Sequence, residues 1–416
     1  MIKFYIHPEA EKFRAEIAYT LNLWAKNQST TIQFTPDADQ AVTIGMGEDH
    51  TLKILADHFR PSNSDASLSD PNTKLTDIAH PLSLVFYMIN AIQEFDSPDH
   101  DELKRFKFKN SYQSKFGNAK ENLVQRYFDQ ISKTVRVPLR HEKTSFFLSH
   151  DIDLVNGAII EDGFAVLKQG RFDLFLKMLF NVAMRRPDWL NMDKIMKLES
   201  AYDCRSIFFW IVNKGKLNQR ESNADYSFRS DQIQRQFTNV GASHFENGIH
   251  KSLTQESFMD EFEKYGSQPF ANRYHYLKFT VPEAFHDIEA AGLKLDASLG
   301  FAEEIGFRNS YGLPFNPYNF RQKKAFQFVE APLHVMDRTY FQYKRFSPAA
   351  AENDIFDFFE KNKMNCVLSI LWHNNFFTDY KFKGYLPLYK KILSFIRDSN
   401  FSTITASEIV NKYSIA

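Results

Sequence analysis

Short apolar runs alternate with amphipathic stretches along most of this chain. Near the N-terminus, four runs with strand-like patterning surround one stretch at residues 10–24 that has the 3.6-residue period of a helix. The four runs lie at residues 3–6, 31–34, 41–44 and 51–55. We therefore expect a small α/β unit here, followed by a polar surface loop at residues 60–74 and helices at residues 81–95 and 119–135.

From residue 145 onward, strand-like runs alternate with helical ones about seven times. We expect strands at residues 146–149, 206–212, 242–249, 274–279, 294–296, 327–330, 366–372 and 401–405. We expect helices at residues 164–182, 192–202, 282–291, 349–361, 386–397 and 406–413, and one that begins at Thr254. Repeated strand–helix units indicate a parallel sheet, either doubly wound or closed as a barrel.

The fold class that this pattern favours is α/β, with a distorted (β/α) barrel of about seven strands preceded by a small α/β domain. A charged, proline-containing segment at residues 138–143 separates the two regions. We therefore place an N-terminal α/β domain at residues 1–138 and the barrel at residues 139–416.

Composition excludes several classes of function. The 51 basic residues balance the 51 acidic ones, so the chain lacks the basic field that nucleic acid or an anionic membrane surface requires. Only two cysteines occur, Cys204 and Cys366, so a metal would have to be held by histidine and carboxylate. No stretch is long and apolar enough for a transmembrane helix, and the first residues do not resemble a signal peptide. We expect a cytoplasmic protein, and a homo-oligomer is left open.

The segment Ser149-His150-Asp151-Ile152-Asp153 ends an apolar run with two closely spaced carboxylates. Carboxylates at this spacing repel one another unless a cation or a shared proton offsets their charge. At the carboxyl end of a barrel strand, where active sites lie, a divalent metal ion would fulfil this role. The alternative is a strand end followed by a helix-capping aspartate.

Three segments together resemble the polysaccharide deacetylase family, the NodB-homology carbohydrate esterases. They are Ser149 to Asp153, the run Ser206-Ile207-Phe208-Phe209-Trp210, and Glu246-Asn247-Gly248-Ile249-His250-Lys251-Ser252. The resemblance covers residues 144–412 and is greatest to a two-domain bacterial branch. It implies a distorted (β/α) barrel, a divalent metal, commonly zinc, and removal of acetyl groups from N-acetylated sugars.

The resemblance also implies roles for individual residues. Asp151 would be the general base, and Asp153 and His250 would bind the metal. Where the family has a second histidine ligand, this chain has Thr254. Candidates for the missing ligand are water or one of three histidines, His150, His244 and His275.

Arg273-Tyr274-His275-Tyr276 matches the family's third motif, with histidine in place of proline. In the family this arginine orients the base by a bidentate ion pair, so we expect Arg273 to contact Asp151. The alternative for Arg273 is a surface charge on a strand. Asp296 and Arg308 lie in a segment typical of the branch, and either pair with each other or face the sugar.

Trp372-His373 ends the last long apolar run and fits the motif that supplies the family's general acid. We therefore expect His373 to lie across the pocket from Asp151 without binding the metal, and Trp372 is a candidate substrate contact. The resulting hypothesis is a metal-dependent hydrolase that acts on the amide bond of an N-acetylated carbohydrate. Two alternatives are a catalytically silent carbohydrate-binding relative, favoured by Thr254, and a D-x-D glycosyltransferase.

Overall fold

The computed structural model describes residues 1–415 apart from 62–79, 96, 185, 219–220 and 379. Most of the polar segment predicted as a loop at residues 60–74 therefore lies outside the described residues. In the part of the chain that is described, no helix is long and apolar enough to cross a membrane.

The N-terminal region contains a parallel four-stranded sheet in the order β2-β1-β3-β4. Its strands are β1 (Ile2–Ile6), β2 (Ile32–Phe34), β3 (Val42–Gly45) and β4 (Leu52–Lys53). The connection from β1 to β2 runs through the short 3-10 helix η1 (Pro8–Phe13) and α1 (Arg14–Asn27). Phe4 and Ile6 alternate with more exposed residues along β1 and pack into the core, as the sequence pattern predicts.

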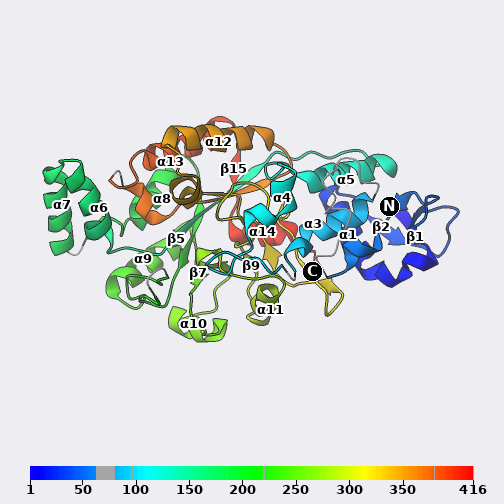
Figure 1. Ribbon diagram of the computed structural model, residues 1–416, viewed down its shortest axis with the longest axis horizontal. Helices are drawn as coiled ribbons and strands as arrows, with labels where there is room; N and C mark the ends of the chain where they lie inside the picture. Colours follow the sequence, from blue (N-terminus) through cyan, green and yellow to red (C-terminus); the bar gives the residue numbers. More distant parts are fainter. Residues whose placement is uncertain (62–79, 96, 185, 219–220, 379, 416) are drawn as a thin grey trace.

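The helices that follow join this unit to the rest of the molecule (Figure 1). They are α3 (Pro81–Ile89), α4 (Tyr112–Lys115) and α5 (Leu123–Thr134). Every residue of α3 is buried, which is typical of a helix enclosed on all sides. The Trp24 indole N–H donates to Ser132 Oγ (2.9 Å), which links α1 to α5. One continuous hydrophobic core contains side chains from both sides of residue 138.

The larger sheet is curled, and its strand pairs are parallel. Its strands are β5 (Ser145–Ile152), β6 (Ser206–Trp210), β7 (Glu246–Lys251), β8 (Ala271–Tyr274), β9 (Leu295–Asp296), β12 (Val329–Glu330), β13 (Val335–Met336), β14 (Val367–Leu371) and β15 (Ser402–Thr403). The order is β12-β9-β8-β7-β6-β5-β14-β13, with β15 paired to β5. The predicted α/β fold with a distorted barrel is confirmed.

The two edge strands of this sheet, β12 and β13, are consecutive in the chain. The segment between them crosses the gap, with the Leu333 amide bonded to the Leu299 carbonyl (3.0 Å) and the His334 amide to the Ser369 carbonyl (3.2 Å). The barrel is thus closed by one chain segment that changes partners, and not by a continuous ladder of hydrogen bonds.

Helices surround the curled sheet (Figure 1). They are α6 (Ala158–Lys168), α7 (Phe172–Ala183), α8 (Met192–Ser200), α9 (Asp231–Gly241), α10 (Phe258–Tyr265), α11 (Glu283–Ala290), α12 (Pro348–Lys361), α13 (Tyr385–Asp398) and α14 (Ala406–Tyr413). Two of them, α6 and α7, project from one end of the molecule (Figure 1). A short antiparallel hairpin, β10 (Tyr318–Asn319) and β11 (Lys324–Ala325), lies apart from the sheet.

Several predicted elements differ from the structure. The single helix expected at residues 164–182 is two helices, because Gly170 has a φ of +72° and ends the first one. The sequence pattern missed α9. The strand expected at residues 274–279 is β8, which ends at Tyr274, so that His275 leaves the sheet at its carboxyl edge.

Gly306 offers a test of how the two regions are held together. Its φ is +118°, and a Cβ there would lie 2.1 Å from the Ala119 carbonyl oxygen, so we expect Gly306→Ala to destabilise the protein by about 3 kcal/mol or more. Gly117 also has a positive φ, but nothing lies within 4 Å of its Cβ position. Gly117→Ala should therefore cost only about 1–2 kcal/mol of backbone strain. Urea unfolding of both variants measures the difference, and equal losses would contradict the proposed clash.

Candidate active site

The carboxyl end of β5 brings two carboxylates to one face of the barrel. Asp151 and Asp153 are two residues apart, so an extended backbone directs both side chains to the same side. Both residues are buried. His150 directly precedes Asp151 and faces the other way, where its Nδ1 is 2.6 Å from the Trp372 carbonyl oxygen and its Nε2 2.9 Å from Glu199 Oε1. The structure therefore does not place His150 among the candidate ligands.

Asp151 is held by Arg273, which extends from β8 across the curled sheet. The guanidinium donates from Nη1 to Asp151 Oδ1 (2.9 Å) and to Ser149 Oγ (2.8 Å). Its Nε donates to the Ala297 carbonyl (2.8 Å), so the expected bidentate pair with Asp151 is not formed. Arg273 is fully buried, which rules out the alternative of a surface charge. One carboxylate oxygen of Asp151 is fixed, and the other faces His250.

Asp153, His250 and His275 form a compact group of potential metal ligands. Asp153 Oδ1 lies 3.4 Å from His250 Nε2 and 3.6 Å from His275 Nδ1, and the two nitrogens are 3.1 Å apart. Tetrahedral bonds of about 2.0–2.1 Å to one zinc ion would place ligand atoms about 3.3 Å apart. Asp153 Oδ1 is also buried without a hydrogen-bond partner in the described structure. These three residues fit a metal ion.

Each histidine of this group is oriented by a backbone carbonyl. His250 Nδ1 is 2.8 Å from the Arg273 carbonyl oxygen, and His275 Nε2 is 2.9 Å from that of Ser222. A carbonyl can only accept, so in each ring this nitrogen is the donor. The lone pair of the other nitrogen is then available inside the pocket. The third side chain of this group is thus His275, whereas the Thr254 hydroxyl lies 3.5 Å from Glu261 Oε1.

The electrostatics of Asp153 and His275 suit metal binding. Burial raises the pKa of Asp153, but the charges of His275, His250 and His373 outweigh it and hold this pKa well below its usual range. Burial lowers the pKa of His275 to about 4. At neutral pH Asp153 is therefore ionised and His275 is neutral, which are the protonation states that metal ligands require. For His250, burial lowers the pKa but the charges of Asp151 and Asp153 outweigh it and raise the pKa, so a metal ion there competes with a proton.

His373, the second residue after β14, lies in the same pocket. Its Nδ1 is 2.7 Å from Asp337 Oδ1, its backbone amide donates to Asp337 Oδ2 (2.6 Å), and its Nε2 lies 3.6 Å from Asp153 Oδ2. The sequence pattern did not identify Asp337 as a candidate site residue. Asp337 follows the short strand β13 as Asp153 follows β5, so the pattern of an apolar run followed by aspartate could have revealed it. Arg338, also missed, places Nη2 3.9 Å from Asp153 Oδ2.

A cavity of about 600 Å³ is bordered by Asp151, Asp153, His250, His275 and His373. One wall comes from the N-terminal region, which contributes Asp101, Glu102, Leu103 and Arg105. Arg105 donates to Asp101 Oδ2 (2.7 Å) and to the Tyr276 carbonyl (2.9 Å), so this wall is tied to the loop that carries His275.

The structure places three sequence candidates away from the cavity. Arg308 does not pair with Asp296 but with Glu94 of the N-terminal region, Nε to Oε1 at 2.7 Å. Trp372 is fully buried and packs against Tyr385 and Tyr389, so its surroundings are those of a core residue.

Asp296 lies beneath the site, next to Glu330 on the adjacent strand. It accepts hydrogen bonds from Asn272 Nδ2 (2.7 Å) and Ser298 Oγ (3.0 Å). Burial raises the pKa of Asp296, and burial together with the Asp296 charge raises that of Glu330 well above its usual range. The raised pKa values favour a protonated carboxyl in this pair, and the surroundings of Asp296 are those of a structural residue.

Comparisons with known proteins give only a remote likeness. No protein-family model and no curated protein sequence matches the chain. Among solved structures, a Mycobacterium smegmatis protein described as a polysaccharide deacetylase is 11% identical, with a TM-score of 0.40 over 66% of this chain and 92% of that one. The peptidoglycan deacetylase PdaC from Bacillus subtilis is 11% identical, with a TM-score of 0.29 over 65% and 92%. BA3943, a CE4 family pseudoenzyme from Bacillus anthracis, is 10% identical, with a TM-score of 0.30 over 66% and 68%.

The carboxyl pair of Asp296 and Glu330 predicts a pH-dependent stability. A raised pKa in the folded state means that the folded protein binds more protons than the unfolded chain above pH 4.5. The free energy of unfolding should therefore fall by up to about 1.4 kcal/mol per pH unit as the pH rises above 4.5. In Glu330→Gln this slope should be smaller. Urea unfolding between pH 5 and pH 8 measures it, with the exposed Glu283→Gln as control; equal slopes in wild type and Glu330→Gln would contradict the assignment.

Proposed function

We propose that this protein is a metal-dependent hydrolase that removes the acetyl group from an N-acetylated sugar. The observation that carries this proposal is the arrangement around one cavity. A ligand group of Asp153, His250 and His275 lies between a carboxylate fixed by arginine and a histidine fixed by aspartate. Amide hydrolysis needs an activated water, stabilisation of the developing oxyanion and a proton for the departing nitrogen, and this arrangement provides for each.

Two imidazoles and one carboxylate form a donor set typical of catalytic zinc, which leaves a coordination position open. A zinc ion bound there would lower the pKa of water and polarise the acetyl carbonyl. The residues of this chain supply the remaining functions.

Asp151 is placed to act as the general base. Its Oδ1 is occupied by Arg273, and its Oδ2 lies 3.3 Å from His250 Nε2 at the border of the ligand group. A water that approaches the ligand group thus meets a carboxylate oxygen in a fixed orientation. Asp151 takes the proton of this water while the oxygen attacks the acetyl carbon.

His373 is placed to act as the general acid. Its Nδ1 hydrogen bond to Asp337 fixes the ring, and its Nε2 is directed into the cavity toward Asp153. As the C–N bond breaks, Nε2 delivers a proton to the nitrogen, and the products are acetate and an amine. Asp337 acts through His373 and is a positioning residue.

The cavity also suits a sugar. Tyr276, Tyr343, Arg105 and Arg338 combine ring surfaces with hydrogen-bond donors, which is how polar ring-shaped ligands are commonly bound. Because residues 101–105 form one wall, we assign part of the substrate recognition to the N-terminal region.

Two observations bear on the alternative functions. Thr254 favoured a silent carbohydrate-binding protein because it leaves one ligand position empty, but His275 supplies an imidazole at that site. In a D-x-D glycosyltransferase, both carboxylates serve a metal–nucleotide complex. The engagement of Asp151 by Arg273 and of His373 by Asp337 favours hydrolysis over that function.

The role of His275 can be tested by metal analysis and acetate release from N-acetylglucosamine oligomers. We expect His275→Ala to lose zinc affinity by at least about tenfold and to lose activity with it, because one of three protein ligands is removed. Thr254→Ala is the matched control, and we expect it to keep both. Asp151→Asn should keep its zinc but lose about two or more orders of magnitude in turnover.

The outcomes separate the hypotheses. Loss of zinc in Thr254→Ala but not in His275→Ala would contradict the ligand assignment. Full zinc binding without acetate release from any N-acetylated sugar would favour the silent relative.

A further inference from the structure

A second group of metal-binding side chains lies at the carboxyl edge of the N-terminal sheet, apart from the proposed active site. His7 directly follows β1, Glu9 lies in the first turn of η1, and His50 belongs to the loop between β3 and β4. One nitrogen or oxygen of each side chain lies within 4.8 Å of the others. In the strand order β2-β1-β3-β4, the chain goes from β1 to β2 on one side and then returns to β3 on the other side of β1. The connections after β1 and β3 therefore run in opposite directions, and they diverge between these two strands. Open α/β sheets bind ligands at such switch points.

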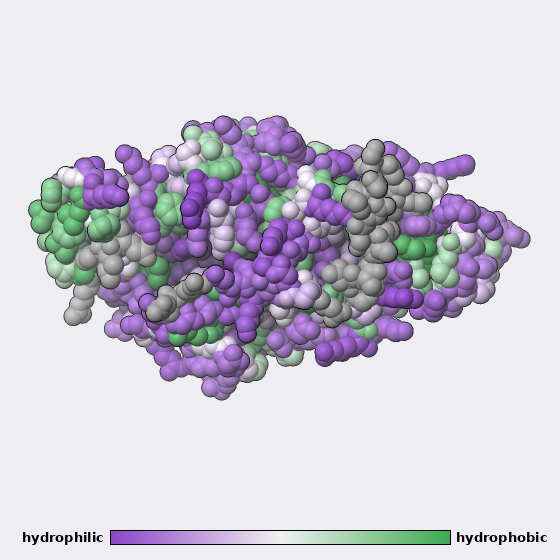
Figure 2. Space-filling model, viewed as in Figure 1, coloured by the Kyte–Doolittle hydropathy of each residue, from purple (hydrophilic) through white to green (hydrophobic). Residues whose placement is uncertain are grey.

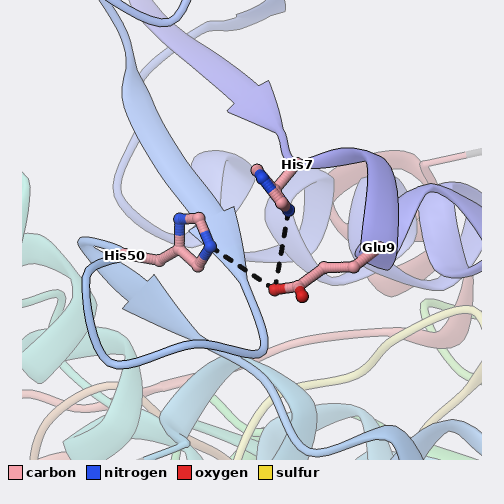
Figure 3. Close-up of side chains that lie close together, drawn as sticks. All are labelled: His7, Glu9 and His50. Atoms are coloured by element: carbon pink, nitrogen blue, oxygen red, sulfur yellow. Dashed lines mark ion pairs between the residues drawn. The ribbon is translucent and has the colours of Figure 1, made fainter.

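The geometry resembles that of the first ligand group. Both imidazoles are directed at the same carboxylate oxygen (Figure 3), with Glu9 Oε1 at 3.4 Å from His50 Nε2 and 3.6 Å from His7 Nδ1. These distances are close to the separation of about 3.3 Å expected for two ligands of one tetrahedral zinc ion. His7 Nδ1 is inaccessible to solvent and has no hydrogen-bond partner among the described residues.

The backbone of residues 45–47 holds Glu9 and His50 in place. Glu9 Oε1 accepts hydrogen bonds from the amides of Met46 (2.6 Å) and Gly47 (3.2 Å), and the Met46 amide lowers the pKa of Glu9. The carboxylate is therefore fixed in its charged form. Gly45 lies directly under the His50 ring, where an added Cβ would come within 2.1 Å of a ring carbon. Only glycine allows the imidazole to lie this close to the strand end.

We propose that His7, Glu9 and His50 bind a divalent transition-metal ion, with zinc as the first candidate. Imidazole and carboxylate donors select such ions over magnesium and calcium, which prefer oxygen ligands alone. Three protein ligands leave a fourth position open to water or a small anion, and the partly exposed side chains of His7 and Glu9 leave that position accessible. The site is independent of the proposed hydrolase chemistry.

Zinc titration of the metal-free protein tests the proposal. We expect two zinc ions per wild-type chain and one in His50→Ala, while removal of the exposed His244 as a control changes nothing. Glu9→Gln keeps an oxygen for the amides of Met46 and Gly47 but loses the charge, so it should weaken the same site at least tenfold without disturbing the fold. Wild-type zinc content and affinity in both His50→Ala and Glu9→Gln would overturn the proposal.

The His275→Ala variant separates this site from the proposed active site. If the active-site metal exists, His275→Ala retains one ion and the combination with His50→Ala retains none. If only the N-terminal site binds metal, wild type holds one ion, His275→Ala still holds it, and His50→Ala loses it.

A different observation concerns the helical hairpin of α6 and α7, which projects from one end of the molecule (Figure 1). Along α7, Phe172, Leu176 and Phe180 follow one another at intervals of four residues, and each is more than 60% exposed. On α6, Phe164 is 72% exposed. Met178 is buried on the other side of α7, so this helix is apolar both toward the core and toward solvent. The exposed apolar surface is visible at the left of Figure 2.

A contiguous exposed patch of this kind indicates a contact surface. Its exposed charges include Lys168, Lys177 and Arg186, while Arg171 is paired with Asp173. The 12 residues of α7 span about 18 Å, too short to cross a bilayer. Apolar side chains flanked by basic ones on a short helix are typical of segments that lie in the membrane interface. The balanced charge of the whole chain predicts no attraction to an anionic membrane, but this apolar and basic surface is local to the hairpin. We infer that the hairpin docks the protein on an anionic membrane surface.

This hairpin begins directly after the strand that carries the two carboxylates, since α6 starts at Ala158 and β5 ends at Ile152. Docking would therefore hold the cavity close to the membrane. The inference rests on the surface alone and does not depend on the hydrolase proposal.

Sedimentation with lipid vesicles tests the docking surface. We expect wild type to bind vesicles of phosphatidylcholine with 30% phosphatidylglycerol, to bind pure phosphatidylcholine far less, and to be released by salt. Phe172→Ser with Phe180→Ser should reduce binding at least tenfold, whereas Leu217→Ser with Met259→Ser, exposed apolar residues elsewhere, should not. Failure of wild type to bind anionic vesicles would overturn the inference. So would self-association in light scattering that the Phe172 and Phe180 changes abolish, since a second copy would then cover the patch.

Discussion

The structure depends above all on keeping two carboxylates buried side by side at the end of β5. Their mutual repulsion has to be offset, and it is offset separately for each. Arg273 neutralises Asp151, while the histidines at the ends of β7 and β8 surround Asp153. The compensating side chains are fixed in turn by backbone carbonyls of Ala297, Arg273 and Ser222, so the electrostatic requirement determines how the neighbouring loops are held.

The residues that the sequence predicted to lie together share one property, which is that each lies at or just beyond the carboxyl end of a strand. Asp153, His250 and His373 come at or directly after apolar runs. The carboxyl ends of parallel strands meet at one edge of a sheet, so knowledge of the strand order is not needed to predict that these side chains converge. The alternation within β5 also accounts for His150, which the two-residue period sends to the opposite face.

What the sequence did not reveal depends on contacts between distant segments or on very short elements. Asp337 follows a strand of two residues, too short for a recognisable period. Arg308 pairs with Glu94, 214 residues earlier, and no local pattern encodes such a partner. His275 was one of several candidates, and only the early end of β8 turns its ring into the pocket. The third ligand thus depends on where a strand stops, which is the least predictable property of a strand from sequence.

The N-terminal region is coupled to the barrel through both packing and charge. Side chains from both regions share one hydrophobic core, and the Glu94–Arg308 pair is buried between them. An arginine left without its partner in such surroundings would be strongly unfavourable, so the barrel requires the N-terminal region for more than its cavity wall. Arg105 extends this coupling to the site, because it joins the wall at residues 101–105 to the loop that presents His275. A change in the N-terminal region can therefore reach the proposed metal ligands through a single hydrogen bond to the Tyr276 carbonyl.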